Sequence, residues 1–110
     1  MSELKKILAF NEKFVREERY KAFIAGKFPE RKLAILSCMD TRIVELLQAA
    51  LGVGNGDVKM IKNAGAVVMH PWGSVMRSLL TAVLQLQVGE IMVVAHYDCG
   101  MRGMHPEAFL

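Results

Sequence analysis

Three side chains that could bind a transition metal occur in this 110-residue chain at Cys38, His96 and Cys99. Thiolate and imidazole are the ligands that Zn²⁺ prefers, usually in a tetrahedron of four ligands. The His-x-x-Cys spacing lets His96 and Cys99 converge on one ion, and Cys38 could complete a Cys₂His set. Three protein ligands leave a fourth position for water, which is typical of a catalytic zinc site. In the alternative interpretation, the cysteines are buried small hydrophobes and His96 is an ordinary hydrogen-bonded histidine.

Asp40 and Arg42 follow Cys38 so closely that they could take part in the same chemistry. In an extended segment, positions 38, 40 and 42 point roughly to one side. Asp40 could then accept a hydrogen bond from a zinc-bound water, while Arg42 holds the same carboxylate in a bidentate pair. The competing interpretation is an ion pair at a helix start, where Asp40 favours the N-terminal dipole.

The strands that would carry these residues are predicted from short apolar runs at 33–36, 57–61 and 91–95. The first and last runs show no alternation, as expected of strands that are covered on both faces. A brief extended piece is expected at 67–69. Ligands gather beyond the carboxyl ends of parallel strands, which is where the cysteines and His96 would lie.

Helices are predicted between these strands. Apolar periodicity indicates an amphipathic N-terminal helix over 4–25 and further helices over 42–51 and 74–86, the last capped by Ser74. A final helix is expected to open at 105–106. Strands that alternate with helices indicate an α/β fold with a parallel sheet flanked by helices.

The composition is that of a globular protein, and we expect residues 1–110 to form a single domain. Hydrophobic residues make up 53% of the chain and charged residues 23%. The net charge of +3 comes mainly from an N-terminal segment in which basic residues alternate with glutamates. Such mixing is typical of a solvated helix face rather than a nucleic-acid surface. The apolar fraction is high for so short a chain, which favours burial against a second copy.

Neither a secretion signal nor a membrane span is expected from the sequence. A charged amphipathic stretch follows Met1, and polar residues interrupt the most apolar run, at 79–95. With two cysteines, the chain is expected in the reducing cytoplasm, where thiols serve metals or catalysis more often than disulfides.

Three successive motifs carry a resemblance to a known family. They are SCMDTR at 37–42, KNAG at 62–65 and HYDCGM at 96–101. In this order and at about this spacing they resemble the signatures of the β-class carbonic anhydrases, especially those of the compact prokaryotic branch. The resemblance covers nearly all of the chain after Phe28.

This resemblance implies Zn²⁺ on Cys38, His96 and Cys99, with Asp40 and Arg42 as the catalytic dyad. It implies reversible hydration of carbon dioxide to bicarbonate by zinc-bound hydroxide, in obligate homodimers or larger homo-oligomers. Asp40 would orient the nucleophile, and Arg42 would keep Asp40 from becoming a fourth zinc ligand. Family members continue beyond the last motif, so the C-terminal strand and helices of the family are expected to be absent here.

Several other residues could support the site. Gly65 is expected close to the metal, where a side chain would crowd it, and Asn63 could brace the loop. Asp98 could orient a metal ligand or form a turn. His70 and His105 could transfer protons to solvent or be ordinary surface histidines.

Three alternative functions remain open at this stage. The same centre could hydrolyse carbonyl sulfide or carbon disulfide. The chain could instead be a non-catalytic, zinc-stabilised oligomeric module in which Asp40 closes the fourth position. A redox pair of Cys38 and Cys99 is disfavoured because the sequence contains no Cys-x-x-Cys.

Overall fold

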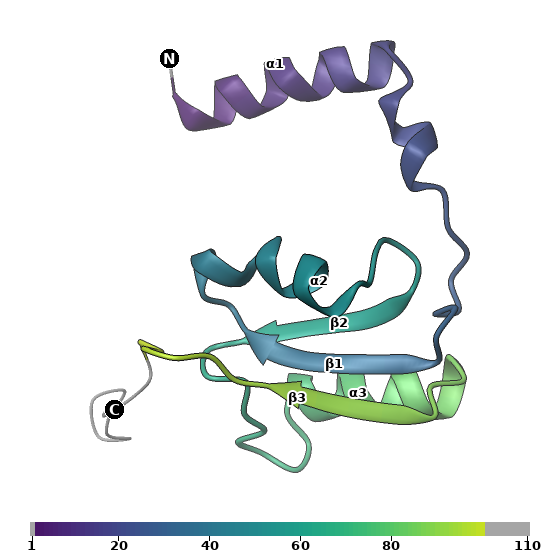
Figure 1. Ribbon diagram of the computed structural model, residues 1–110, viewed down its shortest axis with the longest axis vertical. Helices are drawn as coiled ribbons and strands as arrows, with labels where there is room; N and C mark the ends of the chain where they lie inside the picture. Colours follow the sequence, from purple (N-terminus) through teal and green to yellow (C-terminus); the bar gives the residue numbers. More distant parts are fainter. Residues whose placement is uncertain (1, 101–110) are drawn as a thin grey trace.

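The computed structural model describes residues 2–100 and contains a three-stranded parallel sheet in the order β2-β1-β3 (Figure 1). The strands are β1 (Leu33–Cys38), β2 (Val58–Asn63) and β3 (Glu90–Val94). Because all three run in one direction, their carboxyl ends meet at the same edge of the sheet. The predicted α/β fold with a parallel sheet is therefore confirmed.

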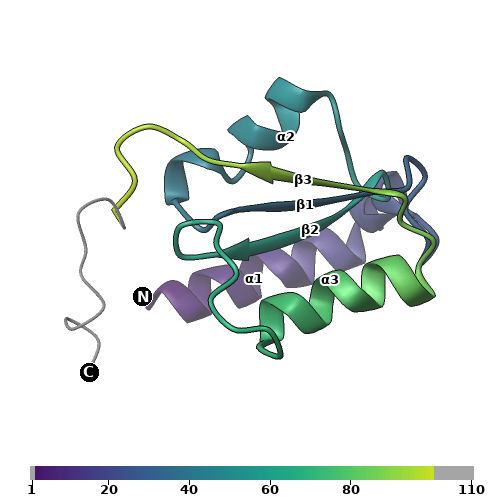
Figure 2. The same cartoon turned by 90° about the horizontal axis from the view of Figure 1, so that it is seen from below.

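The two helices that flank the sheet lie on its opposite faces (Figure 2). They are α2 (Leu46–Leu51) and α3 (Ser74–Gln85). Ile35 of β1 packs in the cluster on the α2 side, whereas Ala34 packs against Ala82 of α3. The central strand is thus buried on both faces, as its unbroken apolar run predicts. None of the helices within residues 2–100 is long and apolar enough to cross a membrane.

The strand predicted at 91–95 is present, but its side chains are less buried than expected. β3 forms an edge of the sheet, and its side chains are largely exposed, with Val93 at 60%. An unbroken apolar run indicates that a strand packs against other elements on both faces. It does not show that the described residues supply this packing. The brief extended piece expected at 67–69 pairs with no strand of the sheet and lies in the loop between β2 and α3.

The predicted helix starts also need correction. Residues 42–51 do not form one helix, because a 3-10 turn, η2 (Thr41–Ile43), precedes α2. The N-cap residue of α3 is Gly73 and not Ser74. Ser74 is the first helical residue, and no side chain caps the start of this helix. The helix expected from 105–106 lies outside the described residues.

The predicted helix over 4–25 is divided into α1 (Glu3–Arg16) and the 3-10 helix η1 (Arg19–Phe23). The break occurs at Glu18, whose φ of 56° is left-handed, and it allows the Phe23 ring to pack 6.3 Å from the Phe14 ring. Apolar periodicity continues through such a turn, so the sequence pattern does not reveal it. No side chain of α1 is buried. We call residues 3–28 the N-terminal arm, and its helices α1 and η1 stand apart from the sheet in Figure 1.

Gly56 fixes the point at which the arm leaves the sheet. Its φ is 90°, and a Cβ atom there would lie 2.7 Å from the Cβ of Ala25. Beside it, the Asn55 side chain donates a hydrogen bond of 2.6 Å to the Phe23 carbonyl. The arm therefore contacts the turn before β2 at Gly56, a position where only glycine fits.

We expect Gly56→Ala to lower the free energy of unfolding by roughly 1–3 kcal/mol, since it combines a left-handed backbone with a steric conflict. Denaturant unfolding would measure the change. Gly52→Ala is the matched control, because its φ is 68° but a Cβ there would meet no atom within 4 Å. Equal losses in the two variants would contradict a role for the contact with Ala25.

Candidate metal centre

The donor atoms of Cys38, His96 and Cys99 all lie within 4.8 Å of one another. Cys38 ends β1, and the other two residues follow β3. These neighbouring strands pair in parallel up to Ser37 and Val94, so the segments after them leave the sheet side by side. The structure therefore brings together the three residues that the sequence indicates as metal ligands.

The two cysteine sulfurs are free thiols that lie 3.6 Å apart. Two sulfurs bound to one tetrahedral zinc at about 2.3 Å each would be separated by roughly 3.8 Å. The observed spacing is close to this value. The sulfur pair thus fits a shared Zn²⁺.

His96 presents a ring nitrogen suited to the same ion. Its Nδ1 lies 2.8 Å from the Tyr97 carbonyl oxygen, which can only accept a hydrogen bond. In the neutral ring Nδ1 therefore carries the proton and Nε2 carries the lone pair. Nε2 is buried and, among residues 2–100, has no hydrogen-bond partner. A buried acceptor without a partner beside two sulfurs fits a third metal ligand.

The surroundings of Cys38 favour its thiolate. The backbone N–H of Gly65 contributes most, the His96 side chain adds to it, and together they lower the pKa of the Cys38 thiol to about 7. The Cys38 side chain in turn raises the pKa of His96. Because a metal binds thiolate rather than thiol, the lowered pKa favours the ligand form of Cys38 near neutral pH. Gly65 has a φ of 89°, so glycine is needed here for its backbone conformation.

Asp40 and Arg42 form the expected bidentate pair beside these ligands. Arg42 Nε donates to Asp40 Oδ1 at 2.9 Å and Nη2 donates to Oδ2 at 2.8 Å. This guanidinium holds the pKa of Asp40 well below its usual range, so the carboxylate is ionised. Asp40 Oδ2 lies 3.8 Å from His96 Nε2. The expected extended segment is absent here: Asp40 is the N-cap of the 3-10 turn and also accepts from the Arg42 backbone N–H.

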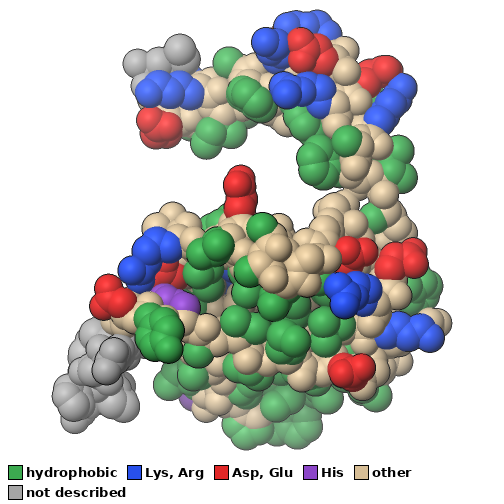
Figure 3. Space-filling model, in the orientation of Figure 1, with side chains coloured by type: hydrophobic (Ala, Val, Ile, Leu, Met, Phe, Trp, Pro, Cys, Tyr) green, Lys and Arg blue, Asp and Glu red, His purple; other side chains and the backbone are tan. Residues whose placement is uncertain are grey.

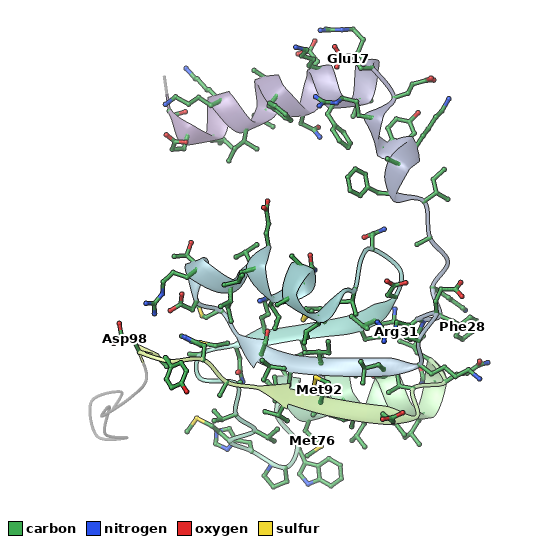
Figure 4. All side chains as sticks on the ribbon, in the orientation of Figure 1. Glu17, Phe28, Arg31, Met76, Met92 and Asp98 are labelled. Carbon is green, nitrogen blue, oxygen red and sulfur yellow. The ribbon has the colours of Figure 1, made fainter. Side chains whose placement is uncertain are left out.

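Two contacts at this edge of the sheet have no clear signal in the sequence. Arg42 Nη2 donates a 2.9 Å hydrogen bond to the carbonyl of Asp98, which lies past the end of β3 (Figure 4). Lys62 Nζ lies 3.4 Å from the Cys38 carbonyl and 3.5 Å from the Ile43 carbonyl. The turn at 41–43 supplies Arg42 and Ile43 to these contacts, whereas Lys62 and Cys38 lie on paired neighbouring strands.

The remaining candidates have simpler surroundings. Asn63 braces the following loop, since its side chain hydrogen-bonds both the N–H and the carbonyl of Val67. His70 is exposed in the loop before α3. His105 lies outside the described residues.

Comparisons with known proteins agree with this geometry. The model of the carbonic anhydrase family matches residues 33–107. The Bacillus subtilis protein named "Putative carbonic anhydrase YvdA" is 50% identical over 110 residues, which are 100% of this chain and 56% of YvdA. The crystal structure of β-carbonic anhydrase isoform I from Trichomonas vaginalis superposes with a TM-score of 0.88 at 34% identity, covering 99% of this chain and 60% of that one.

A relative with a different named activity is also similar. The carbon disulfide hydrolase of Saccharolobus solfataricus is 34% identical over 92 residues, which are 83% of this chain and 43% of the hydrolase. The chain thus spans little more than half the length of YvdA and less than half that of the hydrolase.

Proposed function

This chain belongs to the β-class carbonic anhydrase family, and on that premise we propose that it catalyses the reversible hydration of carbon dioxide to bicarbonate and a proton. The observation that supports this most is the cluster of Cys38, His96 and Cys99 donor atoms beside the ionised Asp40–Arg42 pair. We propose Zn²⁺ as the cofactor, because two thiolates and one imidazole form a donor set that zinc prefers and leave one position open.

Each residue has a separate task in this proposal. Zn²⁺ held here would lower the pKa of water toward ~7 and so supply a nucleophile near neutral pH. Cys38, Cys99 and neutral His96 would hold the ion, and the two thiolates would offset its charge. Asp40 stays ionised beside Arg42, accepts a hydrogen bond from the attacking water and orients it toward carbon dioxide. The water oxygen adds to the carbon, and the released proton passes to solvent.

Arg42→Ala should retain zinc when zinc is saturating but lose hydration activity. Without the guanidinium, the Asp40 carboxylate is free to turn toward the metal and occupy the open position. We expect kcat/KM for carbon dioxide to fall by about 10–100-fold, the usual effect of removing a residue that orients a metal site. Stopped-flow hydration with a pH indicator would measure it. Arg77→Ala, an exposed arginine on α3, is the control, and unchanged kcat/KM in Arg42→Ala would contradict the role of the dyad.

Hydrolysis of carbon disulfide or carbonyl sulfide is the second candidate, favoured by the identity of 34% to a carbon disulfide hydrolase. One zinc-loaded preparation would be assayed for carbon dioxide hydration and for sulfide release from both sulfur substrates. The control is Cys99→Ser, which should lack zinc. Hydration above this control supports the first proposal, and sulfide release alone would replace it. One zinc per chain with neither activity would indicate a non-catalytic module.

We also propose that the protein is a homodimer or larger homo-oligomer of the reducing cytoplasm. Figure 3 shows open space between the N-terminal arm and the rest of the molecule, with hydrophobic side chains on the arm's lower side. Leu4 and Leu8 of α1 are 65% and 58% exposed. A second copy would cover this apolar surface. The two free thiols support a reducing environment.

A further inference from the structure

We propose that Arg42 has a second task, which is to position the loop at 96–100 and thereby to set how slowly the centre releases its metal. The inference rests on the proposed ligands Cys38, His96 and Cys99. It differs from the pairing of Arg42 with Asp40, because it concerns the segment that follows β3. Arg42 is a positioning residue in this role, since it acts through the main chain beside Cys99.

The loop at 96–100 has few other attachments. Pairing between β1 and β3 ends at Ser37 and Val94. Within residues 2–100, this loop makes no backbone hydrogen bond to another element. Its hydrogen bonds to the rest of the described chain are the Cys38–Cys99 sulfur contact and those from Arg42. Arg42 therefore supplies two of these three hydrogen bonds, and both reach Asp98, which lies between the two ligands of the loop.

The contact of Arg42 with Asp98 involves mainly the main chain. Nη2 donates to the Asp98 carbonyl at 2.9 Å, whereas Nη1 lies 3.5 Å from the Asp98 carboxylate. That carboxylate is 91% exposed, so its ion pair contributes little in water. Asp98 has a left-handed φ of 54°. Aspartate adopts this conformation more readily than most non-glycine residues, and the Asp98 carbonyl that accepts from Arg42 belongs to this left-handed residue.

The guanidinium joins two ligand-bearing segments at once. Its Nε and Nη2 atoms bind the Asp40 carboxylate in the turn after Cys38, and Nη2 also binds the Asp98 carbonyl, one residue before Cys99. The distance between the Cys38 and Cys99 sulfurs therefore depends on Arg42. Its loss should free the 96–100 loop and make release of the metal faster.

The test measures zinc release in variants that carry Asp40→Asn. This substitution removes the carboxylate that could otherwise bind the metal. Asp40→Asn is compared with Asp40→Asn/Arg42→Ala by transfer of zinc to an excess of chelating dye at fixed pH. We expect the double variant to release zinc on the order of 10-fold faster. Replacing zinc with Co²⁺ gives a second readout, because a weaker thiolate-to-cobalt absorption band reports loss of a sulfur ligand. Asp40→Asn/Arg77→Ala removes an arginine remote from the centre and should match Asp40→Asn.

Further variants separate the carbonyl contact from the charge. Asp98→Asn keeps the main-chain carbonyl, and asparagine tolerates the left-handed backbone. Its zinc-release rate should therefore stay within about twofold of that of the unsubstituted protein. Arg42→Lys in the Asp40→Asn background keeps the charge without the planar guanidinium and should also release zinc faster. Equal release from Asp40→Asn and the Arg42→Ala double variant would overturn the inference, as would fast release from Asp98→Asn. Absence of zinc from the unsubstituted protein would instead overturn the metal assignment itself.

Discussion

Replacement of Cys38 by Ser, His96 by Ala or Cys99 by Ser is expected to reduce bound zinc from one ion per chain to nearly none. The three donor atoms converge within 4.8 Å, and within residues 2–100 no other cluster of three such side chains could take over. A hydroxyl or a methyl group in place of one ligand leaves two strong ligands, and among residues 2–100 Asp40 is the nearby carboxylate that could substitute. Metal analysis after dialysis against zinc-free buffer would measure the loss.

The control for this experiment is His70→Ala, which removes an exposed histidine from the loop before α3. It should keep its full complement of zinc. Circular dichroism of each metal-free variant would show that the fold is retained, which matters most for Cys38 because it is buried. Full occupancy in any of the three ligand variants would overturn the assignment of that residue.

The clustering of Cys38, His96 and Cys99 and the pairing of Asp40 with Arg42 could be predicted from the sequence because each residue lies close to a strand end. A parallel sheet places the carboxyl ends of its strands on one side, and Cys38 and His96 lie close together because β1 and β3 are also neighbours in the sheet. The pairing of Asp40 with Arg42 is local and needs only a short turn. The residue types and the order of the elements therefore predict that these side chains lie close together, whereas the roles of ligand and dyad come from the family resemblance and stay a proposal.

Features that depend on tertiary contacts could not be predicted in the same way. The left-handed turn at Glu18 leaves the apolar periodicity intact, so one amphipathic helix was expected where two helical segments occur. The exposure of Val93 depends on which elements pack against β3, and an apolar run does not specify those elements. The hydrogen bond from Arg42 to the Asp98 carbonyl spans 56 positions and involves a main-chain atom, which has no signature in residue type.

The N-terminal arm provides the physical basis for the second prediction. An isolated helix of about 12–15 residues is marginally stable in water unless an apolar face packs against something. α1 has 14 residues and none of them is buried, although its apolar side chains recur at helical spacing. Its N-cap, Ser2, and its salt bridge from Lys6 to Glu3 stabilise it only slightly. The helix therefore needs a surface beyond the described residues, and we propose that a second copy related by two-fold symmetry provides it for both helices.

We accordingly expect sedimentation at micromolar concentration to give at least twice the chain mass of 12.3 kDa. Leu8→Glu should shift the protein toward monomer, since a two-fold dimer loses two buried leucines. That is roughly 3 kcal/mol or more, which corresponds to an increase on the order of 100-fold in the dissociation constant. Lys13→Glu introduces the same side chain on the polar face of α1 and should leave the dimer intact. A folded monomer of the parent chain, or equal effects of the two substitutions, would show that α1 does not pack against a partner subunit.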